Sequence, residues 1–148
     1  MIIILLAFFI QTGNVNGFVV WISLPIVITI GLINMANNIR DRVKDKASGR
    51  KTLPILLGKK ASITFMAAMY ILAYLIVIFT ALFKSGGSLF YLLVLFSFPM
   101  PIKAIRRFNK NDTPASMMPA MAATGKTNTV FGILYALGIY ISALLGGI

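Results

Sequence analysis

Four long apolar runs, separated by two strongly basic segments, are the feature that most restricts how this chain can fold. The runs cover residues 18–36, 61–83, 88–102 and 128–148. A helix needs about 20 apolar residues to cross the hydrocarbon core of a bilayer, a length that three of the runs reach or approach. A further apolar run at residues 1–10 has about half that length. The pattern predicts an all-α, multi-pass transmembrane helical bundle with about four full spans and one partial N-terminal span.

Composition agrees with a membrane protein and limits the chemistry that the chain can carry. Of its 148 residues, 59% are hydrophobic and only 11% are charged, whereas about a quarter of the residues of a soluble domain are charged. The chain has no cysteine and no histidine, which excludes disulfides, thiol nucleophiles, imidazole bases and zinc sites of the usual kind. Any metal ion must therefore be held by oxygen ligands.

The basic side chains predict one orientation in the membrane, because lysine and arginine near the ends of spans stay on the cytoplasmic side. Residues 37–60 contain eight of the 14 basic side chains and residues 103–127 contain five, whereas Lys84 is alone on the other side. We expect a single transmembrane domain over residues 1–148, with 37–60 as a motif-bearing cytoplasmic loop, 103–127 as a second cytoplasmic segment and the C-terminus outside. This orientation accounts for the net charge of +11, so we expect a lipid bilayer and no nucleic acid as partner.

Three oxygen-bearing side chains recur every four residues after the first full span, at Asn37, Asp41 and Asp45. If the span continues as a helix, they share one face. Two aspartates at this spacing can lie about 6 Å apart, and at an effective dielectric of 20 they repel by roughly 3 kcal/mol. Either a divalent cation or the local basic side chains must offset that repulsion. Oxygen ligands with open positions suit Mg²⁺, which is commonly shared between one or two carboxylates and substrate phosphates.

An alternative interpretation is that this segment is an interfacial helix that anchors the protein, with its acids neutralised by Arg42, Lys44 and Lys46. Beyond it, Gly49 is suited to end the helix in a left-handed conformation. Arg50 and Lys51 follow at once. Arginine grips phosphate with two hydrogen bonds and lysine supplies a point charge, so the pair can stabilise a departing diphosphate. The same two cations also fit simple anchoring on the cytoplasmic side.

These residues carry a family resemblance. The pattern NxxxDxxxD, followed by GRKTL and LG, is similar to the second aspartate-rich motif of the UbiA superfamily of intramembrane prenyltransferases. Within it, NNIRD…D…GRKTLPILLG looks most like the 1,4-dihydroxy-2-naphthoate polyprenyltransferases of menaquinone synthesis, whose usual form is close to NNxRDxxxDxxxGxxTLAxxLG. The segments FFIQTGNV and PAMAATGKTNTVFGILYALG fit the same family. The resemblance covers nearly all of the chain, strongly at residues 37–58 and weakly elsewhere.

The resemblance implies a nine-helix bundle in the bacterial cell membrane, with a polyprenyl diphosphate held by Mg²⁺ between two aspartate-rich motifs. The diphosphate would leave an allylic cation, which the naphthoate ring would attack before losing its carboxyl group. The resemblance also implies a role for each residue of the motif. Asp41 and Asp45 are the catalytic pair, Asn37, Asp41 and Asp45 are the metal ligands, and Asn38, Arg40, Arg50 and Lys51 bind the diphosphate.

The chain also departs from the family pattern. It has only three acidic residues, the third being Asp112, so the first aspartate-rich motif and about four leading helices are absent. Pro54 replaces a common alanine, and Arg42 and Lys44 stand where relatives often carry an acid. We therefore expect the C-terminal half of a nine-helix UbiA-type fold, which needs the missing N-terminal half in the same or a second chain. The alternatives are a prenyltransferase for hydroxybenzoate or haem, and a small membrane protein without enzymatic activity.

Overall fold

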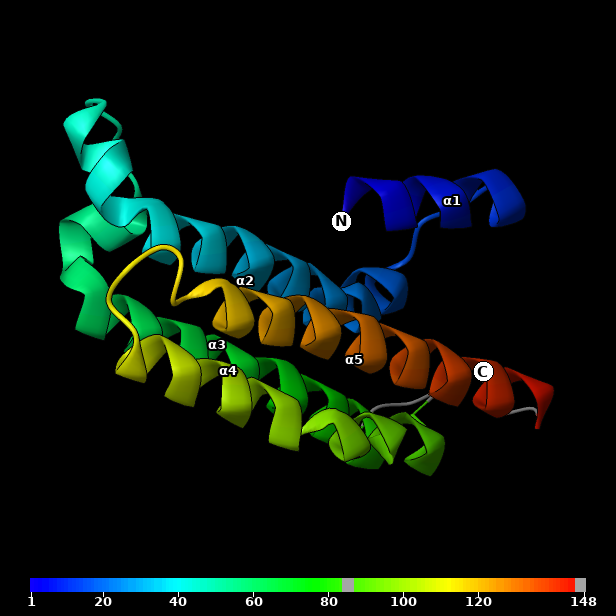
Figure 1. The fold of residues 1–148 in the computed structure, drawn as a ribbon. Coiled ribbons are helices and arrows are strands. Elements are labelled where there is room, and N and C mark those ends of the chain that lie inside the picture. Colours follow the sequence, from blue (N-terminus) through cyan, green and yellow to red (C-terminus); the bar gives the residue numbers. More distant parts are fainter. Residues whose placement is uncertain (84–86, 146–148) are drawn as a thin grey trace.

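The computed structural model of the chain describes residues 1–83 and 87–145, which form helices and no strand (Figure 1). Lys84 and the end of the fourth apolar run lie outside the described residues. The elements are α1 (Ile2–Thr12), α2 (Gly17–Ala47), α3 (Leu53–Phe83), the 3₁₀ helix η1 (Leu89–Ser97), α4 (Pro99–Lys110) and α5 (Met118–Leu144).

Four of the described segments are long and apolar enough to cross a membrane: α2, α3, the continuous segment Leu89–Lys110 and α5. Helix α1 is apolar but shorter than a span. These findings confirm the predicted all-α bundle with four spans and one partial span. The third span is not one regular α-helix, because a 3₁₀ helix precedes α4. Pro99 and Pro101 lie in the first turn of α4, where a proline needs no intrahelical N–H partner.

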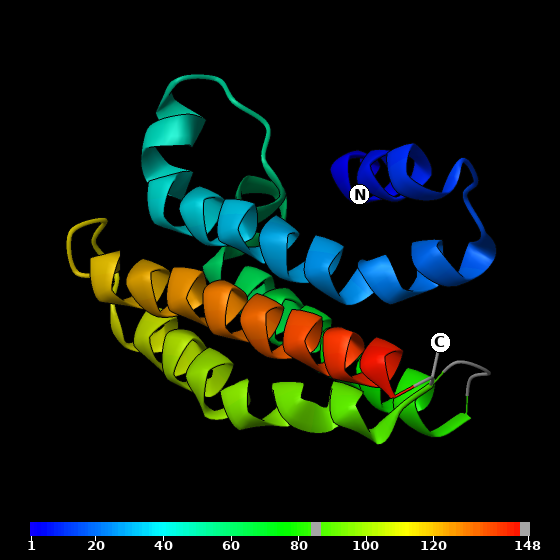
Figure 2. The same cartoon turned by 90° about the vertical axis from the view of Figure 1, so that its right-hand side faces the viewer.

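The four spans form a bundle in which α2 contacts α3 and α5, while α5 also contacts η1 and α4. Its interior holds two clusters of buried apolar side chains. One, near the charged end of α2, includes Met35, Ile39, Met66 and Phe108; the other is aromatic and includes Tyr91, Phe131 and Tyr135. Helix α1 buries no residue and lies to one side of the bundle (Figures 1 and 2). Close side-chain packing, which holds helices together in a membrane, is therefore concentrated in the four spans.

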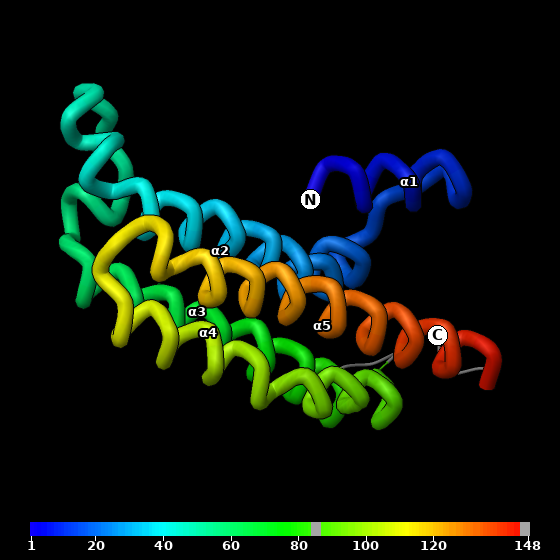
Figure 3. Tube along the Cα trace, in the orientation of Figure 1, coloured from blue at the N-terminus to red at the C-terminus, as the bar shows by residue number. Residues whose placement is uncertain are grey.

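Both basic segments lie at the same end of the bundle, opposite the connection between α1 and α2 (Figure 3). They are joined there by Lys59, whose Nζ donates to the Asn111 carbonyl oxygen at 2.7 Å and pairs with Asp112 Oδ1 at 2.6 Å. The segment 37–60, expected as a loop, is helical on both sides of a short connection at residues 48–52, with a kink inside α3 at Gly58, whose φ of 79° and ψ of 167° are not helical. No glycine or proline stands between Asn37 and Ser48, so nothing stops α2 at the end of its apolar part.

The length of α2 explains how its charged end reaches beyond the apolar part of the bundle. Its 31 residues correspond to about 46 Å of helix, compared with about 30 Å for a hydrocarbon core. Residues 37–47 therefore project past the apolar segment, toward the end where the basic residues gather.

Candidate functional site

The predicted oxygen-bearing residues all lie on the last turns of α2, so Asn37, Asp41 and Asp45 share the helical spacing that the sequence indicated. The helix ends at Ala47, and Gly49 takes the left-handed conformation at φ 74°. The Gly49 N–H donates to the Lys46 carbonyl at 3.1 Å, and the Arg50 N–H donates to the Asp45 carbonyl at 2.9 Å. This pair of bonds is the Schellman arrangement, which closes a helix and reverses the chain. The prediction for Gly49 is confirmed, and the reversal brings Arg50 back to Asp45.

Asp45 is the more buried of the two carboxylates. Its side chain is 10% exposed, while its partner Arg50 is 70% exposed and contacts Asp45 Oδ1 through Nη1 at 3.2 Å. A buried carboxylate without a partner would be strongly unfavourable, and the contact with Arg50 supplies that partner. Because most of Arg50 faces water, its guanidinium keeps donors available for a second anion.

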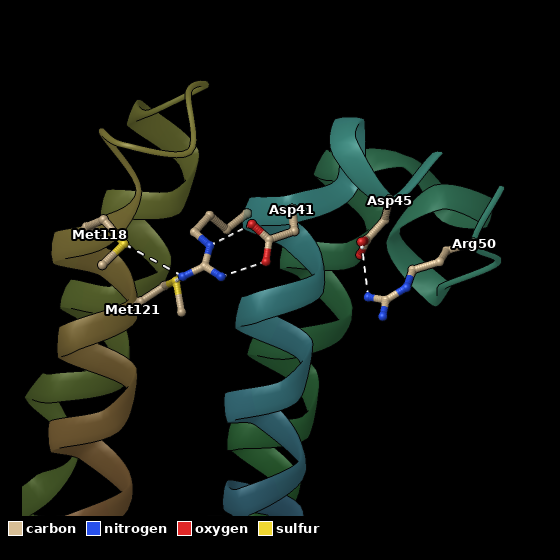
Figure 4. Close-up of polar contacts among 6 residues, drawn as sticks. Asp41, Asp45, Arg50, Met118 and Met121 are labelled. Atoms are coloured by element: carbon tan, nitrogen blue, oxygen red, sulfur yellow. Dashed lines mark hydrogen bonds and ion pairs between the residues drawn. The ribbon is translucent and has the colours of Figure 1, made fainter. Parts of the chain in front are cut away.

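Asp41 is held by the residue that precedes it (Figure 4). Arg40 donates from Nε to Asp41 Oδ1 at 2.8 Å and from Nη2 to Asp41 Oδ2 at 2.6 Å. Its remaining Nη1 points to α5, with 2.9 Å to the sulfur of Met121 and 3.7 Å to that of Met118. The forked shape of guanidinium allows this two-bond pairing, which lysine could not make. Arg40 therefore joins the charged end of α2 to the start of α5.

The two carboxylates do not converge on a common point. In Figure 4 Asp41 points toward Arg40 and the methionines, whereas Asp45 points toward Arg50 on the other side of α2. Arg40 and Arg50 thus supply the positive charge that the sequence required. The anchoring interpretation had assigned that task to other basic residues of the same segment. The described part of the chain contains no group of three or more acidic residues that could hold a metal ion by themselves.

The other predicted residues surround this pair of aspartates. Asn37 and Asn38 are half-buried on α2, and Lys51 is exposed next to Arg50. The structure adds Thr52, which the sequence prediction did not include. Its Oγ1 is buried and has no hydrogen-bond partner among the described residues. Met118 and Met121 were also missed, since they lie 78 and 81 residues from Arg40 in the sequence, and no motif marks them.

The residue types at this end of α2 are those that a partial Mg²⁺ shell uses, but Asp41 and Asp45 would have to turn toward each other to share one ion (Figure 4). Asp41, Asp45 and the amide oxygen of Asn37 are hard oxygen ligands, and Mg²⁺ commonly takes only one or two carboxylates from protein and the rest from phosphates and water. The buried hydroxyl of Thr52, which follows Arg50 and Lys51 in the sequence, lacks within the described part of the chain the hydrogen-bond partner that a buried hydroxyl usually has. For a metal to bind Asp41, however, Arg40 must leave at least one of its two oxygens.

Comparison with known proteins identifies the family of this chain. Residues 1–126 match the UbiA prenyltransferase family. The 1,4-dihydroxy-2-naphthoate octaprenyltransferase of Bacillus subtilis is 44% identical over 142 residues, which are 95% of this chain and 45% of that protein. A UbiA prenyltransferase domain-containing protein 1 homolog of Drosophila melanogaster is 33% identical over 132 residues, 89% of this chain and 35% of that protein.

A second bacterial relative, the 1,4-dihydroxy-2-naphthoate octaprenyltransferase of Escherichia coli, is 29% identical over 106 residues, 72% of this chain and 34% of that protein. The chain thus spans less than half the length of these three relatives. No solved structure gives a significant match. The family match covers most of the chain and includes the charged end of α2; this chain belongs to the UbiA prenyltransferase family.

Proposed function

We propose that this chain supplies one half of the active site of a Mg²⁺-dependent aromatic prenyltransferase. The complete enzyme transfers a polyprenyl group from polyprenyl diphosphate to 1,4-dihydroxy-2-naphthoate, a step of menaquinone biosynthesis. The observation that carries the proposal is the pair Asp41 and Asp45 on one helix end, each held by an arginine. The Bacillus subtilis relative, named for this acceptor, supports the choice of substrate.

The residues of the site divide into those that hold the metal and those that hold the diphosphate. Asn37, Asp41 and Asp45 would hold Mg²⁺, which when bound offsets the charge of the diphosphate leaving group. Arg40 and Arg50 neutralise the carboxylates in this structure. When a diphosphate arrives, its oxygens offer the two guanidinium groups a second set of acceptors, so the arginines move onto phosphate and release carboxylate oxygens.

Lys51, Asn38 and the Thr52 hydroxyl would add further donors for the diphosphate. In the reaction, the bond between the allylic carbon and the diphosphate oxygen breaks, and the diphosphate carries away the bonding electron pair. The aromatic ring of the acceptor then forms a bond to that carbon. Its ionised carboxylate leaves as carbon dioxide, and the electron pair of the broken carbon–carbon bond returns to the ring. Donors fixed around the departing diphosphate stabilise the charge that it gains.

The described residues supply too few acidic side chains to hold a magnesium-bound diphosphate from both sides. Asp112, the third acidic residue, pairs with Lys59 and is 85% exposed, so it does not join the two aspartates. We propose that the remaining acidic ligands belong to an N-terminal half, in the same or a second chain. The site would face the cytoplasm of a bacterial cell, since both basic segments lie at its end of the bundle.

The test is a chimera in which this chain replaces the matching part of the Bacillus subtilis relative. Membranes that contain the chimera are given a polyprenyl diphosphate, Mg²⁺ and one acceptor, either dihydroxynaphthoate or hydroxybenzoate. We expect prenylated naphthoate as the main product. Transfer to hydroxybenzoate alone would show a different acceptor. A folded chimera that transfers to neither acceptor would contradict the proposal and favour a membrane protein without enzymatic activity.

A further inference from the structure

A groove between α4 and α5, separate from the aspartate site, has an excess of positive charge. Its volume is about 300 Å³, and three of its lining residues are basic. The full lining is Met100, Lys103, Arg107, Ala122, Ala123 and Lys126. Lys103 and Arg107 stand four residues apart on α4 and so lie on the same face of the helix. Lys126 faces them from α5, which packs against α4.

These three cations have no anionic partner in the part of the chain that the structure describes. The sequence contains three acidic residues, and each is paired elsewhere: Asp41 with Arg40, Asp45 with Arg50 and Asp112 with Lys59. Membrane orientation explains why these segments are basic. It does not explain why three basic side chains line the same groove. The convergence brings like charges together, which is unfavourable unless an anion from outside the chain lies between them.

The guanidinium of Arg107 is fixed at the rim of this groove. Its Nη1 donates to the carbonyl oxygen of Pro119 at 3.0 Å, which leaves its other N–H groups available. A fork of free N–H donors matches two oxygens of a phosphate, and the lysines add point charges. The chemistry that fits the groove is therefore a phosphate group.

The level of the groove along the helices indicates where the phosphate comes from. Lys103 directly follows the apolar run that ends at Ile102, and Lys126 stands two residues before the apolar run that begins at Asn128. Both lysines therefore mark the boundary between apolar and polar segments, where lipid headgroups lie. The apolar side chains of Met100, Ala122 and Ala123 form the rest of the wall, which suits the start of acyl chains rather than a fully hydrated ion.

We propose that the groove between α4 and α5 binds the headgroup phosphate of an anionic phospholipid. Basic pockets between transmembrane helices are a recurring way to hold such lipids, and each basic residue near the surface contributes to the attraction. The bound lipid would fix the start of α5, the same part of the helix that contacts Arg40 through Met118 and Met121. This proposal does not depend on the reaction that the aspartates support.

The test measures which lipid stays on the purified chain. The 148-residue protein is equilibrated with mixed micelles of phosphatidylglycerol and phosphatidylcholine, and the retained lipids are counted by native mass spectrometry. The test variant is K103Q/R107Q/K126Q. The control variant K60Q/R106Q/K110Q also loses two lysines and one arginine, but from positions that do not line the groove. A second test variant, K103Q/K126Q, keeps the Arg107 bond to Pro119 in case its loss disturbs folding.

We expect the wild type and the control to retain phosphatidylglycerol in preference to phosphatidylcholine. Each cation removed from the groove should lower that retention about fivefold, so the double variant already loses most of it. The proposal would be overturned if the control and both groove variants retained equal amounts of phosphatidylglycerol, or if all three lost it equally. A third arm adds inorganic phosphate at excess. Displacement of the lipid by free phosphate would show that the groove takes a soluble anion, which contradicts a lipid site.

Discussion

Thr52 is the residue whose surroundings are hardest to explain by folding alone. Its hydroxyl is buried and lacks a partner among the described residues, a condition that costs free energy and is uncommon. It lies directly after Arg50 and Lys51, the two cations proposed to hold the diphosphate. An unused donor at this point is explained if a phosphate oxygen accepts its hydrogen bond in the working enzyme.

Thr52→Val in the Bacillus subtilis chimera should therefore separate activity from stability. The stability should stay unchanged or rise slightly, because a hydroxyl without a partner is replaced by a methyl of similar size. Turnover should fall roughly tenfold, since a hydrogen bond to a charged group is lost. Thr52→Ser, which keeps the hydroxyl, is the control and should retain most activity. A Val variant with full turnover would show that this hydroxyl does not serve the reaction.

For single residues, the sequence predicted which residue types form the candidate site, but not which side chains they pair with. Helical spacing was enough to place Asn37, Asp41 and Asp45 at intervals of one turn on α2, but not to show that the carboxylates of Asp41 and Asp45 point to opposite sides (Figure 4). It could not show that Arg40 folds back onto Asp41, because successive residues on a helix do not normally face each other. The contact of Arg40 with Met121 depends on the packing of α5 against α2, and a single sequence carries no signal for that packing.

At the scale of elements, Gly49 fixes the exit of α2 and thereby the place of Arg50. A Cβ at Gly49 would meet nothing within 4 Å, yet its φ of 74° disfavours side chains. We expect Gly49→Ala to lower the free energy of unfolding by about 1 kcal/mol, entirely through backbone conformation. Gly31, inside α2, also has open space around it, and Gly31→Ala should be neutral or stabilising. Denaturant unfolding in detergent measures both, and equal effects would contradict the left-handed cap.

Gly138 marks the closest approach of two elements, α5 and η1. A Cβ there would overlap the carbonyl oxygen of Phe90 and lie 2.9 Å from its carbon, and these are backbone atoms that cannot turn aside. We expect Gly138→Ala to cost about 1–3 kcal/mol of unfolding free energy, as overpacking does. Gly132→Ala on the same helix would make only an ordinary contact of 3.8 Å and serves as the control. If the two variants are equally stable, α5 and η1 are not this close.

The elements themselves were largely predictable, whereas their ends were not. Apolar runs of membrane length give the number of spans, because the bilayer sets that length. The runs stop where charge begins, but α2 continues for eleven residues from Asn37 to Ala47, since a helix ends at a breaker rather than at a change of polarity. The close approach of η1 to α5 at Gly138 is a tertiary contact for which a single sequence carries no signal.

At the scale of the whole molecule, both basic segments lie at one end of the bundle, and α1 lies at its side (Figures 1 and 3). Both connections at that end are basic, and Lys59 joins them through Asn111 and Asp112. This arrangement places the aspartates of α2 and the basic groove of α4 and α5 near the same boundary. The proposed diphosphate site and the proposed lipid groove would therefore lie at the same end of the bundle.

The central claim is that Asp41 and Asp45 form half of a magnesium–diphosphate site, and turnover of the chimera tests it most directly. Prenyl transfer to dihydroxynaphthoate is measured over a range of Mg²⁺ concentrations for Asp41→Asn, Asp45→Asn and the exposed control Asp112→Asn. Each site variant should lose at least about tenfold in turnover at a given Mg²⁺ concentration, as changes around metal sites typically do. Asp112→Asn should match the unsubstituted chimera. Full turnover with unchanged Mg²⁺ dependence in both site variants would contradict the claim.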